Sequence, residues 1–246
     1  MKIKVSYHAV LKAITAAIVV ATITSPASAD VFWNGSSSGD WSTAANWTGG
    51  LPSAGGAGNA VINPGAPFAT PTVTTLGNTT VGQTYLSIGG GLNIVSGSLS
   101  TVDLITGIWG NSAAVSVTGG LLNIGNVLNM GAGGFDGDVN ISGGTVTAPN
   151  LSINTLGGAG MDISGTGSFI TSAGQFGNVT YWIGNNNITA NGGAVGWAVN
   201  VDSLTQPGSL VLTAVSVPEP GLATLLGLGL TCVAFSKKRK QNQFTC

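Results

Sequence analysis

The sequence predicts an all-β protein whose central part is a right-handed parallel β-helix. Three observations carry this prediction: abundant glycine, a Ser/Thr-Gly step that recurs at near-constant spacing, and short stretches in which apolar and polar residues alternate. Glycine occurs 40 times without a period of three, which excludes a collagen-like structure. No part of the body shows the period of an amphipathic helix.

Residues 1–29 are predicted to be a secretory signal peptide. Three lysines precede an apolar run from Ala13 to Ile23, and Ala27 and Ala29 provide the small-x-small pattern of a cleavage site. The mature chain is therefore expected to begin at Asp30 after passage through the export machinery. An uncleaved signal anchor is the alternative.

Residues 30–70 are predicted to cap the N-terminal end of the body. Trp33, Trp41 and Trp47 form a series of Trp-x-Gly, Asp-Trp and Asn-Trp steps. This series resembles the start of many bacterial secreted β-helical proteins, including autotransporter-like passengers. The open end of such a fold exposes strand edges that need covering, which is the role expected of this segment.

Residues 71–175 are predicted to form repeats of about 22–24 residues. The repeated step lies at Ser96, Thr118, Ser142 and Ser164. Each step is preceded by an alternating stretch, at Leu92–Val95, Val115–Val117, Val139–Ile141 and Met161–Ile163. Each is followed by a second apolar element, at Leu104–Ile105, Leu128–Gly131, Leu151–Ile153 and Phe169–Ile170. Two or three strands per repeat would direct Val, Ile and Leu inward, with glycine at the corners. An antiparallel β-sandwich of the same strands is the alternative.

Residues 176–216 are predicted to close the C-terminal end of the body. Short apolar stretches suited to closing strands lie at Tyr181–Ile183, Trp197–Val199 and Leu210–Leu212.

The chain ends in a proline-rich motif, an apolar segment and a basic cluster. The motif consists of Val217, Pro218, Glu219, Pro220 and Gly221, and the basic cluster consists of Lys237, Lys238, Arg239 and Lys240. The 15 residues 221–235 between them would reach about 22 Å as a helix, short of a ~30 Å hydrocarbon core. Snorkelling lysines can cover part of the difference, and the basic cluster should stay on the cytoplasmic side with the tail 241–246.

This C-terminal arrangement resembles the PEP-CTERM sorting signal of Gram-negative bacterial surface proteins. The resemblance covers residues 217–240 and implies that an exosortase-type membrane protease reads the Pro-Glu-Pro motif and processes the tail. It further implies transient insertion in the inner membrane, delivery to the cell surface or matrix, and a link to exopolysaccharide and biofilm. A permanent single-span anchor is the alternative.

The charge distribution excludes several classes of function. Residues 30–216 contain no Lys, Arg, His, Cys or Glu, and their seven aspartates give a charge of −7. The usual zinc ligands and Ser-His-Asp or Cys-His chemistry are therefore absent from the body. Nucleic acid and anionic polysaccharide are poor partners for a segment without cations. Cys232 and Cys246 lie in the tail, so no disulfide can cross-link the body.

The aspartates provide the candidate sites. Asp136 and Asp138 lie two apart in a glycine-rich turn and could place oxygen ligands around Ca²⁺; a solvated turn is the alternative. With Asp162 they could also serve as the acid and base of a polysaccharide hydrolase, at a spacing of about 5–10 Å. Because the body has no Lys, Arg or His to hold the sugar, we expect no enzyme and no cofactor other than possible calcium.

The tryptophans provide a further candidate site. If exposed as a strip, they could stack on neutral sugar rings, although burial in the caps is the preferred interpretation. They are Trp33, Trp41, Trp47, Trp109, Trp182 and Trp197. The expected function is that of a non-catalytic structural or adhesive protein of the surface or matrix. A carbohydrate- or calcium-binding surface module is the alternative.

Overall fold

The computed structural model describes residues 30–35, 39–52, 58–62, 70–73, 79–86, 89–108, 110 and 112–217. The predicted signal peptide, including Ala27 and Ala29, and everything from Pro218 onward lie outside these residues. Within the described ranges, no helix is long and apolar enough to cross a membrane. The processing and anchoring predictions at both ends therefore stay predictions.

The described part of the chain is mostly β, with two sheets whose strands are largely parallel. The smaller sheet has six strands in the described residues: β4 (Thr72–Val73), β6 (Gly91–Ile94), β8 (Ala113–Val117), β10 (Gly137–Ile141), β13 (Met161–Ile163) and β15 (Ile188–Ala190). The larger has eleven: β1 (Val31–Trp33), β2 (Trp47–Thr48), β3 (Ala60–Ile62), β5 (Thr79–Leu86), β7 (Ser98–Thr106), β9 (Leu121–Met130), β11 (Thr145–Thr147), β12 (Asn150–Ile153), β14 (Ser168–Ser172), β16 (Trp197–Asp202) and β17 (Ser209–Ser216).

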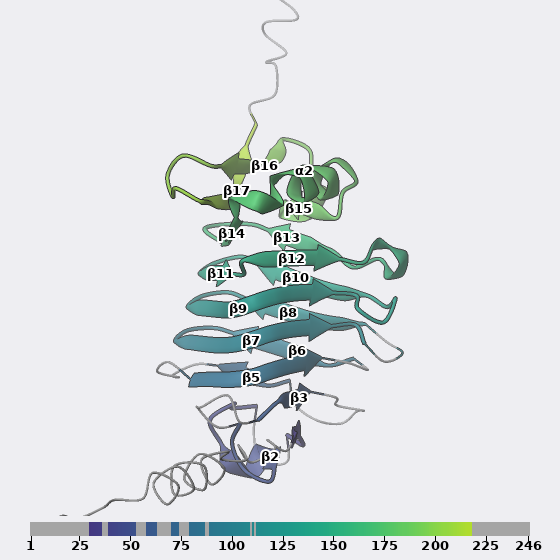
Figure 1. Cartoon of the computed structure of the whole chain (residues 1–246), viewed down its shortest axis with the longest axis vertical. Helices are drawn as coiled ribbons and strands as arrows, with labels where there is room; N and C mark the ends of the chain where they lie inside the picture. The colour runs from purple at the N-terminus through teal and green to yellow at the C-terminus, as the bar shows by residue number, and fades with distance from the viewer. Residues whose placement is uncertain are drawn as a thin grey trace, which may run out of the picture.

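Strands from β4 to β15 alternate between the two sheets as the chain proceeds, with β11 and β12 both lying in the larger one. The four alternating stretches identified in the sequence lie in β6, β8, β10 and β13 of the smaller sheet. The second apolar elements lie in β7, β9, β12 and β14 of the larger one. The strands lie one above another along the long axis (Figure 1).

Pairing between these strands is parallel, for example between β8 and β10 and between β7 and β9. The antiparallel pairing of the sandwich alternative is therefore wrong for them. Antiparallel pairs occur in the described residues only at the two ends, where β1 pairs with β2 and β17 pairs with both β14 and β16.

Apolar register partners form the core between the two sheets. In the smaller sheet Val115 pairs with Leu92 on one side and Val139 on the other, and all three are fully buried. Leu104 and Leu128 are partners in the larger sheet and are also fully buried. Each such side chain stabilises the fold by about 1.5–3 kcal/mol through removal of apolar surface from water.

The repeated Ser/Thr-Gly step marks turns where successive repeats touch. A Cβ added at Gly143 would lie 2.4 Å from the carbonyl oxygen of Thr118, one repeat earlier. The next residue, Gly144, has φ +72°, in the region that favours glycine. Glycine is required here by both close approach and backbone conformation, which explains its recurrence in the sequence.

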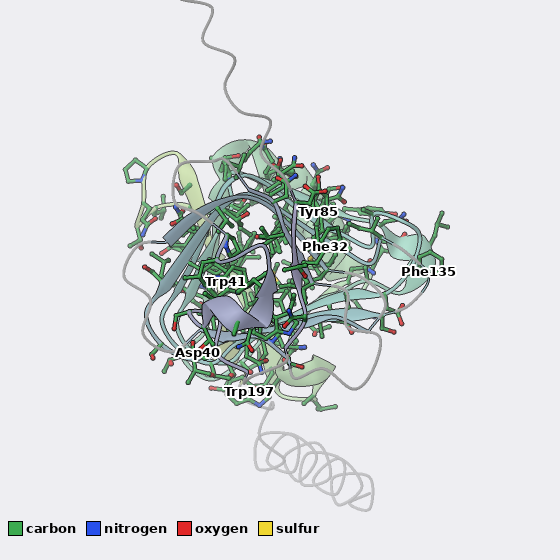
Figure 2. The ribbon with its side chains drawn as sticks, turned by 90° about the horizontal axis from the view of Figure 1, so that it is seen from below. Phe32, Asp40, Trp41, Tyr85, Phe135 and Trp197 are labelled. Carbon is green, nitrogen blue, oxygen red and sulfur yellow. The ribbon has the colours of Figure 1, made fainter. Side chains whose placement is uncertain are left out.

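The N-terminal segment closes its end of the core with buried tryptophans. Trp33, Trp41 and Trp47 are 3%, 1% and 3% exposed. Trp47 makes edge-to-face contacts with both others, at ring-centroid distances of 4.9 and 4.7 Å, and its Nε1 donates to the carbonyl oxygen of Trp41. Seen along the long axis, Trp41 lies near the middle of the molecule and Phe135 at its edge (Figure 2).

The C-terminal end differs from the prediction in one element. Residues 181–183, predicted as a strand, belong to the helix α2 (Phe176–Gly184). Val179 and Trp182 are three residues apart and both buried, which is the spacing of one face of a helix. The prediction of a strand considered only the short apolar stretch around Trp182 and was wrong. The other two predicted closing strands are confirmed as parts of β16 and β17. Four short 3₁₀ helices complete the described elements: η1 (Ala44–Asn46), η2 (Thr155–Gly157), η3 (Ala173–Gln175) and η4 (Asn191–Gly193).

Candidate functional site

The outward face of the smaller sheet carries a row of polar side chains. One residue from each of five neighbouring strands contributes, and neighbours in the row are register partners. Because adjacent strands lie about 4.8 Å apart, the row extends over about 19 Å. This polar row consists of Asn93, Ser116, Asn140, Asp162 and Thr189.

Two hollows lie along the polar row. The first hollow has a volume of about 390 Å³ and is lined by Asn93, Ala114 and Ser116, with neighbouring residues of β6 and β8 and the turns before them. The second hollow, of about 200 Å³, lies over β10, β13 and β15 and includes Asp162 in its lining. Asp138 lines both hollows, so the two are neighbours on this face of the sheet.

Burial raises the pKa of Asp138 above its ordinary value, and the negative charge of Asp136 adds to the increase. A hydrogen bond from the backbone N–H of Gly160 acts in the opposite direction. The neutral carboxylic acid is therefore more accessible at Asp138 than at a fully solvated aspartate. A carboxyl group in this state can either donate or accept a hydrogen bond.

The carboxylate of Asp162 is held in place by two donors. Its Oδ1 accepts from the hydroxyl of Thr189 at 2.8 Å and from the backbone N–H of Gly192 at 2.6 Å. These bonds fix the direction of the side chain in the wall of the second hollow. The structure thus brings Asp138 and Asp162 to one hollow, as the sequence-based pairing of neighbouring repeats required.

Asp136 lies at the turn before β10 and lines neither hollow. One of its carboxylate oxygens accepts from the hydroxyl of Ser112 at 3.4 Å. Within the part of the chain that the structure describes, no three His, Cys, Asp or Glu residues form a group able to hold a metal ion. The predicted calcium site at Asp136 and Asp138 stays a prediction.

Three members of the polar row have no intramolecular hydrogen bond from their side chains within the described residues: Asn93, Ser116 and Asn140. Their amide and hydroxyl groups provide donors and acceptors to a ligand in the hollows. The sequence contained the signal, since each residue is the polar position inside an alternating apolar stretch. None of these three residues was predicted as a site residue from the sequence.

The five tryptophans that the structure describes do not form the exposed strip that sugar stacking would require. Trp33, Trp41 and Trp47 are buried in the N-terminal end, and Trp182 is 8% exposed. Trp197, in β16, is 42% exposed and lies at the periphery of the molecule in the view along the long axis (Figure 2). Trp109, the sixth tryptophan, lies outside the described residues.

Comparison with known proteins gave no matching family model, no matching curated protein and no matching solved structure.

Proposed function

We propose that this chain is an exported bacterial protein of the cell surface or extracellular matrix, with a non-catalytic structural or adhesive role. Its body would be a right-handed parallel β-helix that an exosortase-type system sorts through the PEP-CTERM-like tail. Exopolysaccharide is the proposed surrounding partner, and the tail would anchor the chain in the inner membrane only until it is processed.

One observation carries the proposal for the body: successive strands alternate between two parallel sheets in chain order. In a β-helix each repeat contributes a strand to each sheet, so this order supports that fold. Stacked repeats produce a long, rigid surface from short strands. The absence of Lys, Arg and His from residues 30–216 supports a role other than the binding of polyanions.

The position of the body's last strand supports processing at the tail. Val217 follows β17, is 48% exposed, and its N–H donates to the carbonyl oxygen of Gly196 at 2.8 Å. The Pro-Glu-Pro motif begins at the next residue. A protease could therefore reach the motif without unfolding the described sheets.

The test is an intact-mass measurement with C-terminal peptide mapping after expression in a Gram-negative host that carries an exosortase-type protease. We expect a surface or culture-fluid form that starts at Asp30 and ends between Pro218 and Gly221. The double variant Pro218→Ala/Glu219→Ala should keep the N-terminal cleavage and lose the C-terminal one. A wild-type chain that ends at Cys246 in the membrane fraction would instead establish a permanent anchor and overturn the sorting proposal.

A calcium-binding surface module is a second candidate, favoured by the repulsion between two carboxylates. The charge of Asp136 contributes to the raised pKa of Asp138, and a bound cation would relieve that repulsion. On this candidate, calcium should raise the melting temperature of the protein, and Asp136→Asn/Asp138→Asn should abolish the increase. An increase that survives in the double variant would place the ion elsewhere.

A further inference from the structure

We propose that the polar row and its two hollows bind a neutral, hydroxyl-rich glycan chain laid across the strands of the smaller sheet. The inference deepens the proposed function, on which it depends for the presence of polysaccharide around the protein. It replaces the tryptophans, most of which are buried in the described structure, with a polar face as the sugar-binding surface.

The shape of the site suits a polymer better than a single small molecule. The first and second hollows lie next to each other, with Asp138 in the lining of both, and together their linings extend from β6 to β15. Four strand spacings of about 4.8 Å make this path about 19 Å long. A linear chain of several sugar rings can follow such a path, which has one polar side chain of the row at each strand.

The chemistry of the lining selects a neutral partner. Asn93 and Asn140 each supply an amide that donates and accepts, Ser116 supplies a hydroxyl, and the two aspartates accept from sugar hydroxyls. Hydrogen bonds from hydroxyls to carboxylates are stronger than those between neutral groups. With no cation anywhere in residues 30–216, a uronic or sulfated chain would be repelled by Asp138 and Asp162.

The site is also preorganised. The polar row stands on hydrogen-bonded parallel strands, and Thr189 and Gly192 fix the carboxylate of Asp162. Groups that are already in place lose little conformational entropy when a ligand binds. A flexible glycan would itself be ordered on binding, which predicts modest affinity per ring and a dependence on chain length.

A third hollow, of about 320 Å³, lies on the larger sheet but fits a glycan less well. It is lined by Asn123, Thr147 and Ser172, among others, and no carboxylate contributes. The hydroxyl of Thr147 already donates to the amide oxygen of Asn123 at 2.6 Å. A ligand there would have to replace an existing hydrogen bond, whereas Asn140 on the smaller sheet has none to lose.

The experiment measures retardation of the full chain, purified in mild detergent, by polysaccharides in native affinity electrophoresis. The neutral probes are dextran, laminarin, xylan and galactomannan, and alginate is the anionic control. We expect at least one neutral probe to retard the protein and alginate not to. Asn140→Ala combined with Asp162→Asn should weaken that binding about tenfold, the effect of losing two or three hydrogen bonds.

Two further variants separate binding from folding. Ala114→Trp places a bulky side chain at an exposed position in the first hollow and should block the chain without removing any polar group. Asn200→Ala removes an exposed asparagine of β16, away from both hollows, and should bind as the wild type does. All variants should melt within a few degrees of the wild type.

The results that overturn the inference differ from those that overturn the proposed function. Retardation by none of the neutral probes, or equal weakening by Asn200→Ala, would exclude the site even if the tail is processed normally. Release of reducing ends from a bound probe, lost in Asp138→Asn, would keep the site and overturn the non-catalytic role. A processing defect confined to Pro218 and Glu219 variants would leave glycan binding untouched.

Discussion

The outward faces of the two sheets differ in how far their polar side chains bond to one another. On the larger sheet, Asp103 is 6% exposed and its carboxylate accepts from the amides of Gln83 at 2.7 Å and Asn126 at 2.8 Å. On the smaller sheet, Asn140 is exposed and has no side-chain partner in the described residues. These polar groups of the larger sheet bond to each other, whereas three members of the polar row on the smaller sheet, Asn93, Ser116 and Asn140, are left to solvent or a ligand.

The difference between the two faces shows that polar side chains on parallel strands can either stabilise the fold or stay available for a ligand. Asp103 lies at an irregularity in the pairing of β7 and β9, where its carboxylate also accepts from the backbone N–H of Val127 at 3.2 Å. A buried carboxylate is tolerated only with such donors, so this network fixes the register of the strands. The three members of the polar row without side-chain hydrogen bonds in the described residues contribute little to folding, and this leaves them available for recognition.

The largest effect that separates the two faces should come from Asp103→Ala. The change leaves the Gln83 and Asn126 amides and the Val127 N–H without their acceptor at a nearly buried position. We expect the free energy of unfolding to fall by about 2–4 kcal/mol, measured by urea denaturation. Asp103→Asn keeps one oxygen acceptor, so its free energy of unfolding should fall by less. A loss below about 1 kcal/mol for Asp103→Ala would mean that the two faces do not differ as described.

The next effect concerns the turn that carries the chain from one sheet to the other. In Gly143→Ala the new Cβ would lie 2.4 Å from the carbonyl oxygen of Thr118, and backbone must move to relieve the overlap. We expect the free energy of unfolding to fall by about 2 kcal/mol, while the polar side chains on the outward faces of both sheets stay unchanged. The control is Gly177→Ala in α2, where nothing lies within 4 Å of the added Cβ and alanine should stabilise the helix by about 0.5–1 kcal/mol. Equal melting temperatures for the two variants would contradict the close approach between repeats.

A smaller effect should appear in the pH dependence of Asp138 and Asp202, whose pKa values are displaced in opposite directions. The pKa of Asp138 is raised by burial above its ordinary value of 3.8. At a pH below that ordinary value the carboxyl group of Asp138 is protonated in both the folded and the unfolded state, so it does not lower the free energy of unfolding. As the pH rises through its folded pKa, the charge must form in the hollow and stability decreases. Asp138→Asn should therefore be more stable than the wild type at neutral pH, with an advantage that disappears in acid.

Asp202 should behave in the opposite way. The hydroxyl of Thr205, followed by the backbone N–H groups of Leu204 and Thr205, lowers its pKa below the ordinary value. Its contribution to stability is present above the ordinary pKa and is lost as the pH falls through the folded pKa. Asp202→Asn should thus be slightly less stable than the wild type at neutral pH and converge with it in acid. Melting curves of both variants and the wild type from pH 2 to pH 7 test the two predictions. If the stability difference from the wild type changes with pH in the same direction for both variants, the opposite pKa shifts of Asp138 and Asp202 are contradicted.

Sequence alone predicted the repeating strands because the apolar alternation and the glycine steps are local signals. It also predicted that Asp138 and Asp162 lie in neighbouring repeats, and the structure places both in one hollow. The helix α2 was missed because the apolar stretch at residues 181–183 also fits a strand, and only the burial of Val179 together with Trp182, three residues apart, distinguishes the helix. The Asp103 network was missed because it depends on a register irregularity between strands far apart in the chain.

The smallest expected effect is the stability change in Asn140→Ala, and it tests the comparison from its other side. The side chain is exposed and has no hydrogen-bond partner in the described residues, so the folded state loses no interaction when it is shortened. We expect a change of less than about 0.5 kcal/mol in the free energy of unfolding. Thr147→Ala on the larger sheet is the matched control, because its hydroxyl donates to Asn123 at 2.6 Å, and it should lose about 1 kcal/mol. If Asn140→Ala is the more damaging of the two, the polar row stabilises the fold, and its residues are not reserved for a ligand.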